Sequence, residues 1–591
     1  MRLINVEAFL ERERLMKQGK RVDRRAKVLE FGDDEVTKYA ILSHRWIEQE
    51  EVDYNEVVEL AKMDEEDRAD IRHREGYQKI LQSCEQTRKD GYKWLWVDTC
   101  CIDKRSSAEL SEAINSMYRW YENSRICYAY LHDVHGSSFP TARNNKKYPN
   151  SKGWPEWFSR GWTLQEMIAP RNLQFFNKDW YLIGDKRTLS PILEAITRVS
   201  QHILKEGLSL NRPCVARIMS WAANRTTTRV EDRAYSLMGL LDVNMPMLYG
   251  EGKKSFHRLQ LEIIRTSNDH SIFAWSCEGT KVRVGSVLAD DPSFFRECDE
   301  MELIEPDEFE ESLHKHVNHY IRDFDRNRFG TFPITNRGIQ IWMILCPCVG
   351  SKSVFQAVLP CRSRPSGPPV IINLALWGSE YYRYAGFIQH KEGDFRCREV
   401  YLRYQGMPHC KSTFEIDDSA IFEKGFTCSA TWPKGLITGN TVRLSIADPL
   451  CVKVYSCSQE CDFAVGFGQC FGQDWMHVVC KEPDSPFLWP SYYGPLMLDR
   501  PPAHAKAMEI SCYRYFRNQW RVYTLLTRLP RSTWILQTSS VMWRSSWMLG
   551  VKLEVFHDPG FGNISGEWTR FDVDVSRFFF VHAHYYLIGK Y

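Results

Sequence analysis

The sequence has no apolar run long enough to cross a membrane and no excess of one charge. Its longest apolar stretches, such as residues 338–349, fall far short of the roughly 20 residues that a membrane-spanning helix needs. Residues 1–5 reach a charged side chain before any apolar run, unlike a secretory signal. Lysine and arginine number 77 against 75 aspartate and glutamate, and the net charge of +2 disfavours broad electrostatic binding to nucleic acid. We therefore expect a cytoplasmic protein with no membrane or nucleic-acid partner and with free thiols.

Several familiar motifs are also missing. No Gly-x-Ser-x-Gly or His-Glu-x-x-His occurs, and the stretch 250–255 (GEGKKS) lacks the spacing and the Gly-Lys-Ser order of a phosphate-binding loop. A set of cysteines and one histidine in the C-terminal half does not have the spacing of a zinc ribbon or finger: Cys457, Cys461, Cys470, His477 and Cys480. We predict no metal site and no required cofactor.

Length and composition indicate an ordinary globular protein of several domains. The 591 residues exceed what one core accommodates, and the hydrophobic fraction of 43% and charged fraction of 26% are typical of globular chains. We divide the chain into an N-terminal lead-in (1–35), an α/β domain (36–185), a helical extension packed on it (186–278) and a β-rich region of one or two domains (279–591). The strand-like runs of that last region favour sandwiches.

The α/β domain is predicted from short apolar runs that alternate with helical patterns. Residues 39–43, 94–98 and 126–131 are continuous, aromatic or β-branched runs typical of buried parallel strands, and 173–176 is expected to be a fourth strand. Helices are expected around 77–84 and after the capping sequence that starts at Ser106. This alternation predicts a parallel sheet with flanking helices, in which ligands bind beyond the carboxyl ends of the strands.

Helices are also predicted in the extension. Ser190 and Pro191 have the form of a helix start, followed by an apolar face as far as Ile203. Further helices are expected at 214–223, 230–241 and 251–266.

Four stretches together resemble the fungal heterokaryon incompatibility (HET) domain, in the order of that family. They are residues 39–46 (YAILSHRW), 94–104 (WLWVDTCCIDK), 107–117 (SAELSEAINSM) and 160–166 (RGWTLQE). Residues 219–222, 228–237 and 247–252 resemble what often follows that domain. The resemblance implies a role in non-self recognition and programmed cell death, a form of fungal innate immunity. The nucleotide-binding module and WD repeats of some members have no counterpart here.

A more distant resemblance is to the TIR domain, which implies a flavodoxin-like sheet. Its counterparts here are Ser43-His44, the loop from Asp98 to Asp103, and the element Ser159-x-x-Trp162-x-x-x-Glu166. Several TIR domains hydrolyse NAD with the glutamate of that last element. The resemblance therefore implies Glu166 as the catalytic residue and NAD as the substrate.

Cleavage of the nicotinamide–ribose bond needs few protein groups, because nicotinamide leaves as a neutral base. A carboxylate near the ribose stabilises the developing positive charge, as in glycoside hydrolysis. We assign the remaining substrate-binding positions to the strand ends and the last element: Ser43, His44, Arg45, Trp46, Asp98, Asp103 and Trp162. Trp46 is expected to stack on a base and Arg45 to hold the pyrophosphate.

The same residues also have structural interpretations. Glu166 either catalyses or pairs with an arginine, and the tryptophans either bind ligand or fill the core. The chain is accordingly either an NAD-cleaving effector that acts on self-association or a non-enzymatic signalling and oligomerisation module. By resemblance, residues 99–107 are the expected assembly surface of the HET domain, and the β-rich region is expected to bind a protein partner.

Overall fold

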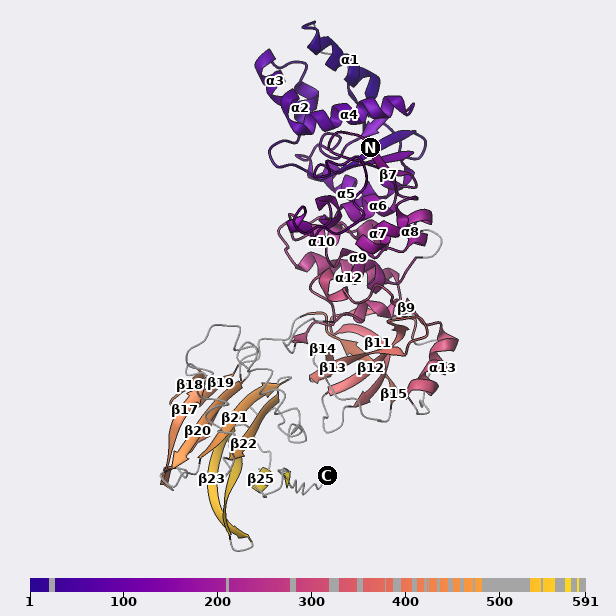
Figure 1. Cartoon of the computed structure of the whole chain (residues 1–591). Coiled ribbons are helices and arrows are strands. Elements are labelled where there is room, and N and C mark those ends of the chain that lie inside the picture. The colour runs from indigo at the N-terminus through magenta and orange to yellow at the C-terminus, as the bar shows by residue number, and fades with distance from the viewer. Residues whose placement is uncertain are drawn as a thin grey trace.

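The structure is a computed structural model of the whole chain (Figure 1). It describes residues 1–20, 27–208, 212–276, 283–317, 329–347, 354–377, 379–385, 395–405 and 412–418. Further on it describes 422–423, 425–432, 436–444, 450–457, 462–470, 473–480, 532–543, 546–557, 569–574 and 582–583. Within these ranges no helix is long and apolar enough to cross a membrane.

The N-terminal part is built on a seven-stranded mixed sheet with the order β2-β1-β4-β3-β5-β6-β7. The strands are β1 (Arg2–Asn5), β2 (Leu29–Phe31), β3 (Tyr39–His44), β4 (Trp94–Trp96), β5 (Ile126–Tyr130), β6 (Leu173–Phe176) and β7 (Leu182–Asp185). The four strands predicted from apolar runs are confirmed, and they run parallel to one another as β4-β3-β5-β6. The prediction of a wholly parallel sheet is wrong, because β1, β2 and β7 add antiparallel pairs at the edges.

The central strands are mostly apolar, as expected for a sheet that helices cover on both faces. Every residue of β3 and β5 is buried. The flanking elements are α1 (Val6–Lys17), α2 (Tyr54–Glu59), α3 (Glu65–His73), α4 (Glu75–Lys89), α5 (Ser107–Asn123), η1 (Pro149–Ser151), η2 (Glu156–Ser159) and α6 (Thr163–Ile168). The domain boundaries remain predictions, although β1 and β2 of the N-terminal lead-in pair within this sheet.

The two predicted flanking helices end and begin where their sequences indicate. Helix α4 is followed by Gly91 at φ +79°, a conformation that favours glycine after a helix. Helix α5 begins after Ser106, whose side chain accepts the N–H of Glu109 at 3.3 Å. The reciprocal half of that capping box is absent, because the Glu109 carboxylate binds the N–H of Asp103 and the guanidinium of Arg2 instead.

The extension is helical, as predicted, but its helices are shorter. They are α7 (Ser190–Thr197), α8 (Gln201–Glu206), α9 (Val215–Ala222), α10 (Asp232–Tyr235), α11 (Met238–Leu241), α12 (Lys254–Thr266) and η3 (His270–Phe273). Leu189, rather than Ser190, is the N-cap of α7. Arg198 at φ +62° separates α7 from α8, so the predicted continuous face to Ile203 is split between two helices.

The glycine-rich turn at 250–252 already holds an internal anion. The N–H groups of Gly250 and Gly252 both donate to Glu231 Oε1, at 2.9 and 3.0 Å. The backbone N–H of Glu231 itself, followed by those of Gly250 and Gly252, lowers the pKa of the Glu231 carboxyl group. The turn therefore holds a carboxylate where a phosphate loop would hold its ligand, consistent with the rejection of that motif.

Beyond residue 283 the chain is rich in strands, as predicted. The first of its sheets contains β8 (Arg283–Gly285), β9 (Glu302–Leu303), β10 (Ile334–Thr335), β11 (Gly338–Pro347), β12 (Val354–Arg362), β13 (Pro369–Trp377), β14 (Glu380–Ala385) and β15 (Arg396–Leu402). Strand β11 pairs with both β15 and β12, so the path β11-β15-β14-β13-β12 closes on itself like a small barrel. The short helices η4 (Pro292–Phe295) and α13 (Pro306–Val317) accompany it.

Two further sheets follow in the described segments. One has the order β18-β19-β16-β23-β24-β25-β26 and the other β17-β20-β21-β22. Their strands are β16 (Ser412–Asp417), β17 (Phe426–Trp432), β18 (Ile437–Thr438), β19 (Thr441–Leu444), β20 (Leu450–Cys457), β21 (Asp462–Cys470), β22 (Gln473–Cys480), β23 (Ser532–Trp543), β24 (Ser546–His557), β25 (Thr569–Asp574) and β26 (His582–Ala583). The strand-like run of the sequence at residues 519–526 lies outside the described residues, and the sandwich arrangement stays a prediction.

Candidate functional site

Strand β3 delivers two polar side chains into two different clusters at its carboxyl end. Successive side chains of a strand point to opposite faces, and Ser43 and His44 are its last two residues. Ser43 contacts Glu166, whereas the nearest carboxylates to His44 are those of Glu51 and Asp98. Both clusters lie at the sheet edge where the sequence predicted a site.

The first cluster surrounds Glu166 on the short helix α6. Ser43 Oγ donates to Glu166 Oε2 at 2.5 Å, and the indole N–H of Trp157 donates to Ser43 Oγ at 2.8 Å. Helix α6 is buried along its whole length, and Glu166 is only 6% exposed. A carboxyl group that is 123 positions from Ser43 in sequence is thus fixed against the end of β3.

This environment favours the neutral form of the carboxyl group. Burial, followed by the nearby Asp98 carboxylate, raises the pKa of Glu166 from 4.5 to about 8. Ser43, Arg225 and Tyr121 oppose the rise by stabilising the charged form. Glu166 is therefore largely protonated near pH 7 and can ionise in response to a nearby positive charge.

Arg225 reaches this cluster from the loop after α9. Its guanidinium is buried, and its Nη1 donates to the carbonyl of Arg160 at 2.8 Å and to Thr163 Oγ1 at 2.9 Å. Thr163 opens α6, three residues before Glu166. Burial lowers the pKa of Arg225 to about 9, and the Glu166 carboxylate opposes that change. The sequence does not reveal this role of Arg225, because an arginine in an Asn-Arg-Thr-Thr loop has the pattern of an exposed turn.

A short backbone ladder holds this loop beside α6. The N–H of Gly161 donates to the carbonyl of Thr226 at 2.9 Å, and the N–H of Thr226 donates to the carbonyl of Ser159 at 2.7 Å. Gly161 permits the close approach, since a Cβ there would lie 2.5 Å from Thr227 Cγ2. The extension is therefore joined directly to the element that carries Glu166.

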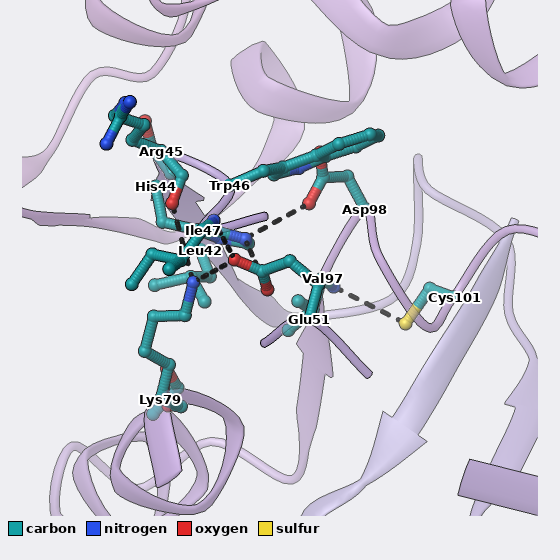
Figure 2. A network of polar contacts seen from close by, with 12 residues as sticks. Leu42, His44, Arg45, Trp46, Ile47, Glu51, Lys79, Val97, Asp98 and Cys101 are labelled. Atoms are coloured by element: carbon teal, nitrogen blue, oxygen red, sulfur yellow. Dashed lines mark hydrogen bonds and ion pairs between the residues drawn. The ribbon is translucent and has the colours of Figure 1, made fainter. Parts of the chain in front are cut away.

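The second cluster centres on Glu51 and is shown in Figure 2. The Lys79 ammonium forms an ion pair with Glu51 Oε1, and His44 Nε2 lies 3.5 Å from Glu51 Oε2 and 3.7 Å from Asp98 Oδ1. Burial alone would raise the pKa of Glu51, but His44 and Lys79 bring it down to about 2. Burial lowers the pKa of Lys79. The sequence does not reveal this ion pair, because residues 47–74, which include Glu51, have the highly charged composition of a solvent-exposed insertion.

Trp46 and Asp98 form the more exposed side of this edge. The indole N–H of Trp46 donates to Asp98 Oδ2 at 2.8 Å, and 48% of Trp46 is exposed. Lys104 Nζ lies 3.8 Å from the centre of the Trp46 ring. Lys104 therefore covers one face of the ring.

Arg45 belongs to a separate ion-pair group at the same edge. Its Nη1 lies 2.8 Å from Glu156 Oε2 and 3.3 Å from His132 Nε2. Burial lowers the pKa of His132. The side chain is half-buried.

Two predicted site residues have their described contacts in other networks. Asp103 forms an ion pair with Arg105 at 2.9 Å, and its N–H binds Glu109. Trp162 precedes α6. Burial raises the pKa of Asp232 in the extension, and the hydrogen bond with the Trp162 side chain opposes part of that rise. The structure thus groups Glu166 with Ser43, and His44 and Trp46 with Asp98, but it gives Asp103 and Trp162 different neighbours.

This edge also has buried polar atoms without a hydrogen-bond partner in the part of the chain that the structure describes. They are His44 Nδ1 and Nε2, Asp98 Oδ1, Thr99 Oγ1, His132 Nδ1, Asp133 Oδ1, Gln165 Nε2 and Arg225 Nη2. Most buried polar groups in proteins are paired, so a group of unpaired ones indicates a place where a polar ligand can bind. Among the described residues, no set of three or more His, Cys, Asp or Glu side chains is arranged to hold a metal ion.

Comparisons with known proteins identify the N-terminal part. Residues 39–154 match the family model "Heterokaryon incompatibility protein (HET)". The chain is 42% identical over 237 residues to the vegetative incompatibility protein HET-E-1 of Podospora anserina, a match that covers 39% of this chain and 16% of that protein. No solved structure matches. By both comparisons, the N-terminal part of this protein is therefore similar to heterokaryon incompatibility (HET) proteins, and residues 39–154 are the part that matches the family model.

Proposed function

We propose that this protein acts in vegetative incompatibility, as an effector of cell death in non-self recognition, and that its HET domain cleaves NAD at Glu166. The HET domain and the similarity to HET-E-1 support the incompatibility role. The observation that carries the enzymatic part is the buried Glu166 carboxyl group, which binds Ser43 at the carboxyl edge of the parallel strands.

The chemistry needs a group that becomes negative when a positive charge develops. The bond between the nicotinamide nitrogen and ribose C1′ breaks, and the nitrogen keeps the electron pair and leaves neutral. Water then adds its oxygen to C1′ and releases a proton, which gives nicotinamide and ADP-ribose. Glu166 has a pKa of about 8 in the free protein, and a bound cationic nicotinamide would lower that pKa and generate the carboxylate where it is needed.

The neighbouring residues have matching roles in this proposal. Ser43, itself bound by Trp157, orients the Glu166 carboxyl group. The half-buried Arg45 binds the pyrophosphate, and Trp46 stacks on the adenine after Lys104 is displaced. His44 and Asp98, which carry unpaired polar atoms, bind ribose hydroxyls. Asp103 and Trp162 have no direct role, given their other contacts.

The TIR likeness and the assembly hypothesis remain part of this proposal. The parallel order β4-β3-β5-β6 supports a TIR-like or flavodoxin-like arrangement of the central strands. Residues 99–107 join β4 to α5 and include exposed charged residues, as a self-association surface in the cytoplasm would require. The β-rich region would bind a protein partner that controls the HET domain.

One observation favours the alternative, a non-enzymatic signalling and oligomerisation module. Glu166 is 6% exposed and is held by Ser43, which is the environment of a structural hydrogen-bonding group. In that case the neutral amide of glutamine would replace it with little effect on assembly or signalling.

The test is NAD consumption by purified full-length protein over a range of concentrations, with Glu166→Gln in parallel. Glu112→Gln is the matched control, because Glu112 is an exposed residue of α5 in the same domain. We expect nicotinamide release that rises steeply with protein concentration and is lost only in Glu166→Gln. Equal release from all three proteins would overturn the assignment of Glu166, and release from none at any concentration would favour the alternative.

A further inference from the structure

We infer that Arg225 is a positioning residue for Glu166, so that the helical extension supplies part of the candidate site. This inference deepens the proposed function and rests on it. The family match at residues 39–154 ends before both Glu166 and Arg225.

The geometry is that of a side chain held in place from two directions. Arg225 donates through one nitrogen to the hydroxyl of Thr163 on α6 and to the carbonyl of Arg160, just before that helix. The Thr163 hydroxyl in turn donates to the carbonyl of Trp157 at 2.5 Å, and Trp157 donates to Ser43. One chain of contacts therefore joins Arg225 to the residue that holds Glu166.

The second nitrogen of the guanidinium makes no hydrogen bond to the described residues. Arg225 Nη2 is buried and has no partner among them, whereas Nη1 has two. A buried cation with an unused donor is costly unless a negative group is close by. The Glu166 carboxylate is the anion that acts on Arg225 most strongly. Arg225 therefore stabilises the ionised form of Glu166, which is the form that the proposed reaction uses.

Several charged or titratable groups surround Glu166, and Arg225 is the main cation among them. Asp98 after β4 raises the pKa of Glu166, and Tyr121 on α5 lowers it together with Ser43 and Arg225. Cys127 on β5 and Arg160 are also close enough to interact with its charge. Removing Arg225 takes away the main cation that opposes the effect of the Asp98 carboxylate, so ionisation of Glu166 becomes harder.

The test measures the pKa of Glu166 without using the enzymatic reaction. The free energy of unfolding is measured between pH 5 and 9 for each protein with Glu166 and for the same protein with Glu166→Gln. The pH dependence of the difference between the two free energies gives the pKa of Glu166, in the wild type and in each variant. Arg225→Met is expected to raise this pKa by roughly one pH unit, the order expected for loss of a neighbouring opposite charge. Arg225→Lys should restore most of the shift. The control Asn224→Ala changes an exposed residue of the same loop whose side chain accepts a hydrogen bond from Lys152, and it should leave the pKa unchanged.

Two further variants keep the test decisive. If Arg225→Met does not fold, Thr163→Val removes the hydroxyl that ties Arg225 to α6 and should shift the pKa in the same direction by less. An unchanged Glu166 pKa in every Arg225 and Thr163 variant would overturn the inference. In NAD cleavage, Arg225→Lys should lower kcat more than it changes KM. If the wild-type protein cleaves no NAD, the proposed function fails, while the pKa measurement still decides the role of Arg225.

Discussion

Glu51 and Glu166 are two shielded carboxyl groups at one end of strand β3, and their pKa values move in opposite directions. Glu51, with Lys79 and His44 beside it, has a pKa of about 2, whereas Glu166, beside hydroxyl groups and the Asp98 carboxylate, has a pKa of about 8. The partners come from adjacent strand residues, His44 and Ser43, which face opposite sides. Burial alone therefore does not set the charge of a carboxyl group. The presence of a direct cationic partner makes one of them a fixed ion and leaves the other able to change its charge.

The largest expected effect comes from breaking the ion pair of Glu51. Lys79→Met leaves the carboxylate without its ammonium partner, and loss of one member of a buried pair costs about 3–5 kcal/mol of unfolding free energy. Urea unfolding measures the loss. The double variant Lys79→Met/Glu51→Gln should be more stable than the sum of the single changes predicts. Strict additivity would show that the pair is not coupled.

The next effect is a pH dependence of opposite sign for the two glutamates. Glu166 has a folded pKa above its ordinary value of 4.5, so its contribution to stability is complete below pH 4.5 and is lost as the pH rises through about 8. Each unit of difference in pKa corresponds to about 1.4 kcal/mol. Unfolding curves from pH 5 to 8 should therefore decline for the wild type and be flatter for Glu166→Gln.

Glu51 provides the opposite case within the same molecule. Its folded pKa of about 2 lies below 4.5, so its contribution is complete above pH 4.5 and is lost as the pH falls toward 2. Glu51→Gln should remove part of the acid sensitivity between pH 3.5 and 5. If Glu51→Gln left the free energy of unfolding at acid pH with the same pH dependence as the wild type, Glu51 would not have the lowered pKa. If Glu166→Gln left the decline toward alkaline pH unchanged, Glu166 would not have the raised pKa.

A change in the backbone contact beside α6 should have a smaller effect. Gly161→Ala places a Cβ 2.5 Å from Thr227 Cγ2, and such overpacking typically costs about 1–3 kcal/mol. Thr227→Ser removes that methyl group and keeps a hydroxyl for the carbonyl of Arg229, so the double variant should recover most of the stability. Thermal unfolding of the three variants measures this, and no recovery would mean that the strain lies elsewhere.

The smallest effect is expected at the exposed side of the edge. Lys104→Gln removes a cation from the face of Trp46, which is worth about 0.5–1 kcal/mol at an exposed site. In the proposed function it also uncovers the ring, so the KM for NAD should fall slightly. Equilibrium unfolding and NAD titration measure the two consequences, and an increase in KM would show that Lys104 assists binding.

The sequence was sufficient for the central strands and insufficient for the charged clusters. Runs such as residues 39–43 and 126–131 predict their strands because burial on both faces requires continuous apolar sequence. The edge strand β7 was not predicted, since a four-residue antiparallel strand with partly exposed side chains has no such pattern. The pairing of Ser43 with Glu166 was suggested only by the TIR resemblance.

The charged partners depend on packing that no local pattern records. Lys79 lies on a helix whose apolar face was predicted from its neighbours Tyr77 and Ile80, yet the lysine itself is buried. Arg225 is buried because its neighbour Thr226, in the loop after α9, pairs with the backbone of Gly161. These two residues are 65 positions apart in the chain. Residues of these types are usually exposed, so sequence reasoning assigns them to the surface by default.

The ladder between Ser159–Gly161 and Thr226 also has a consequence for folding and local motion. It closes a loop between Arg160 and Arg225, which are 65 positions apart, so it can form only after the intervening helices have been brought together. Contacts of this separation tend to form late and to report the opening of a large unit. Slow hydrogen exchange at the amides of Gly161 and Thr226 would therefore follow the unfolding of the extension as a whole rather than the fraying of one loop.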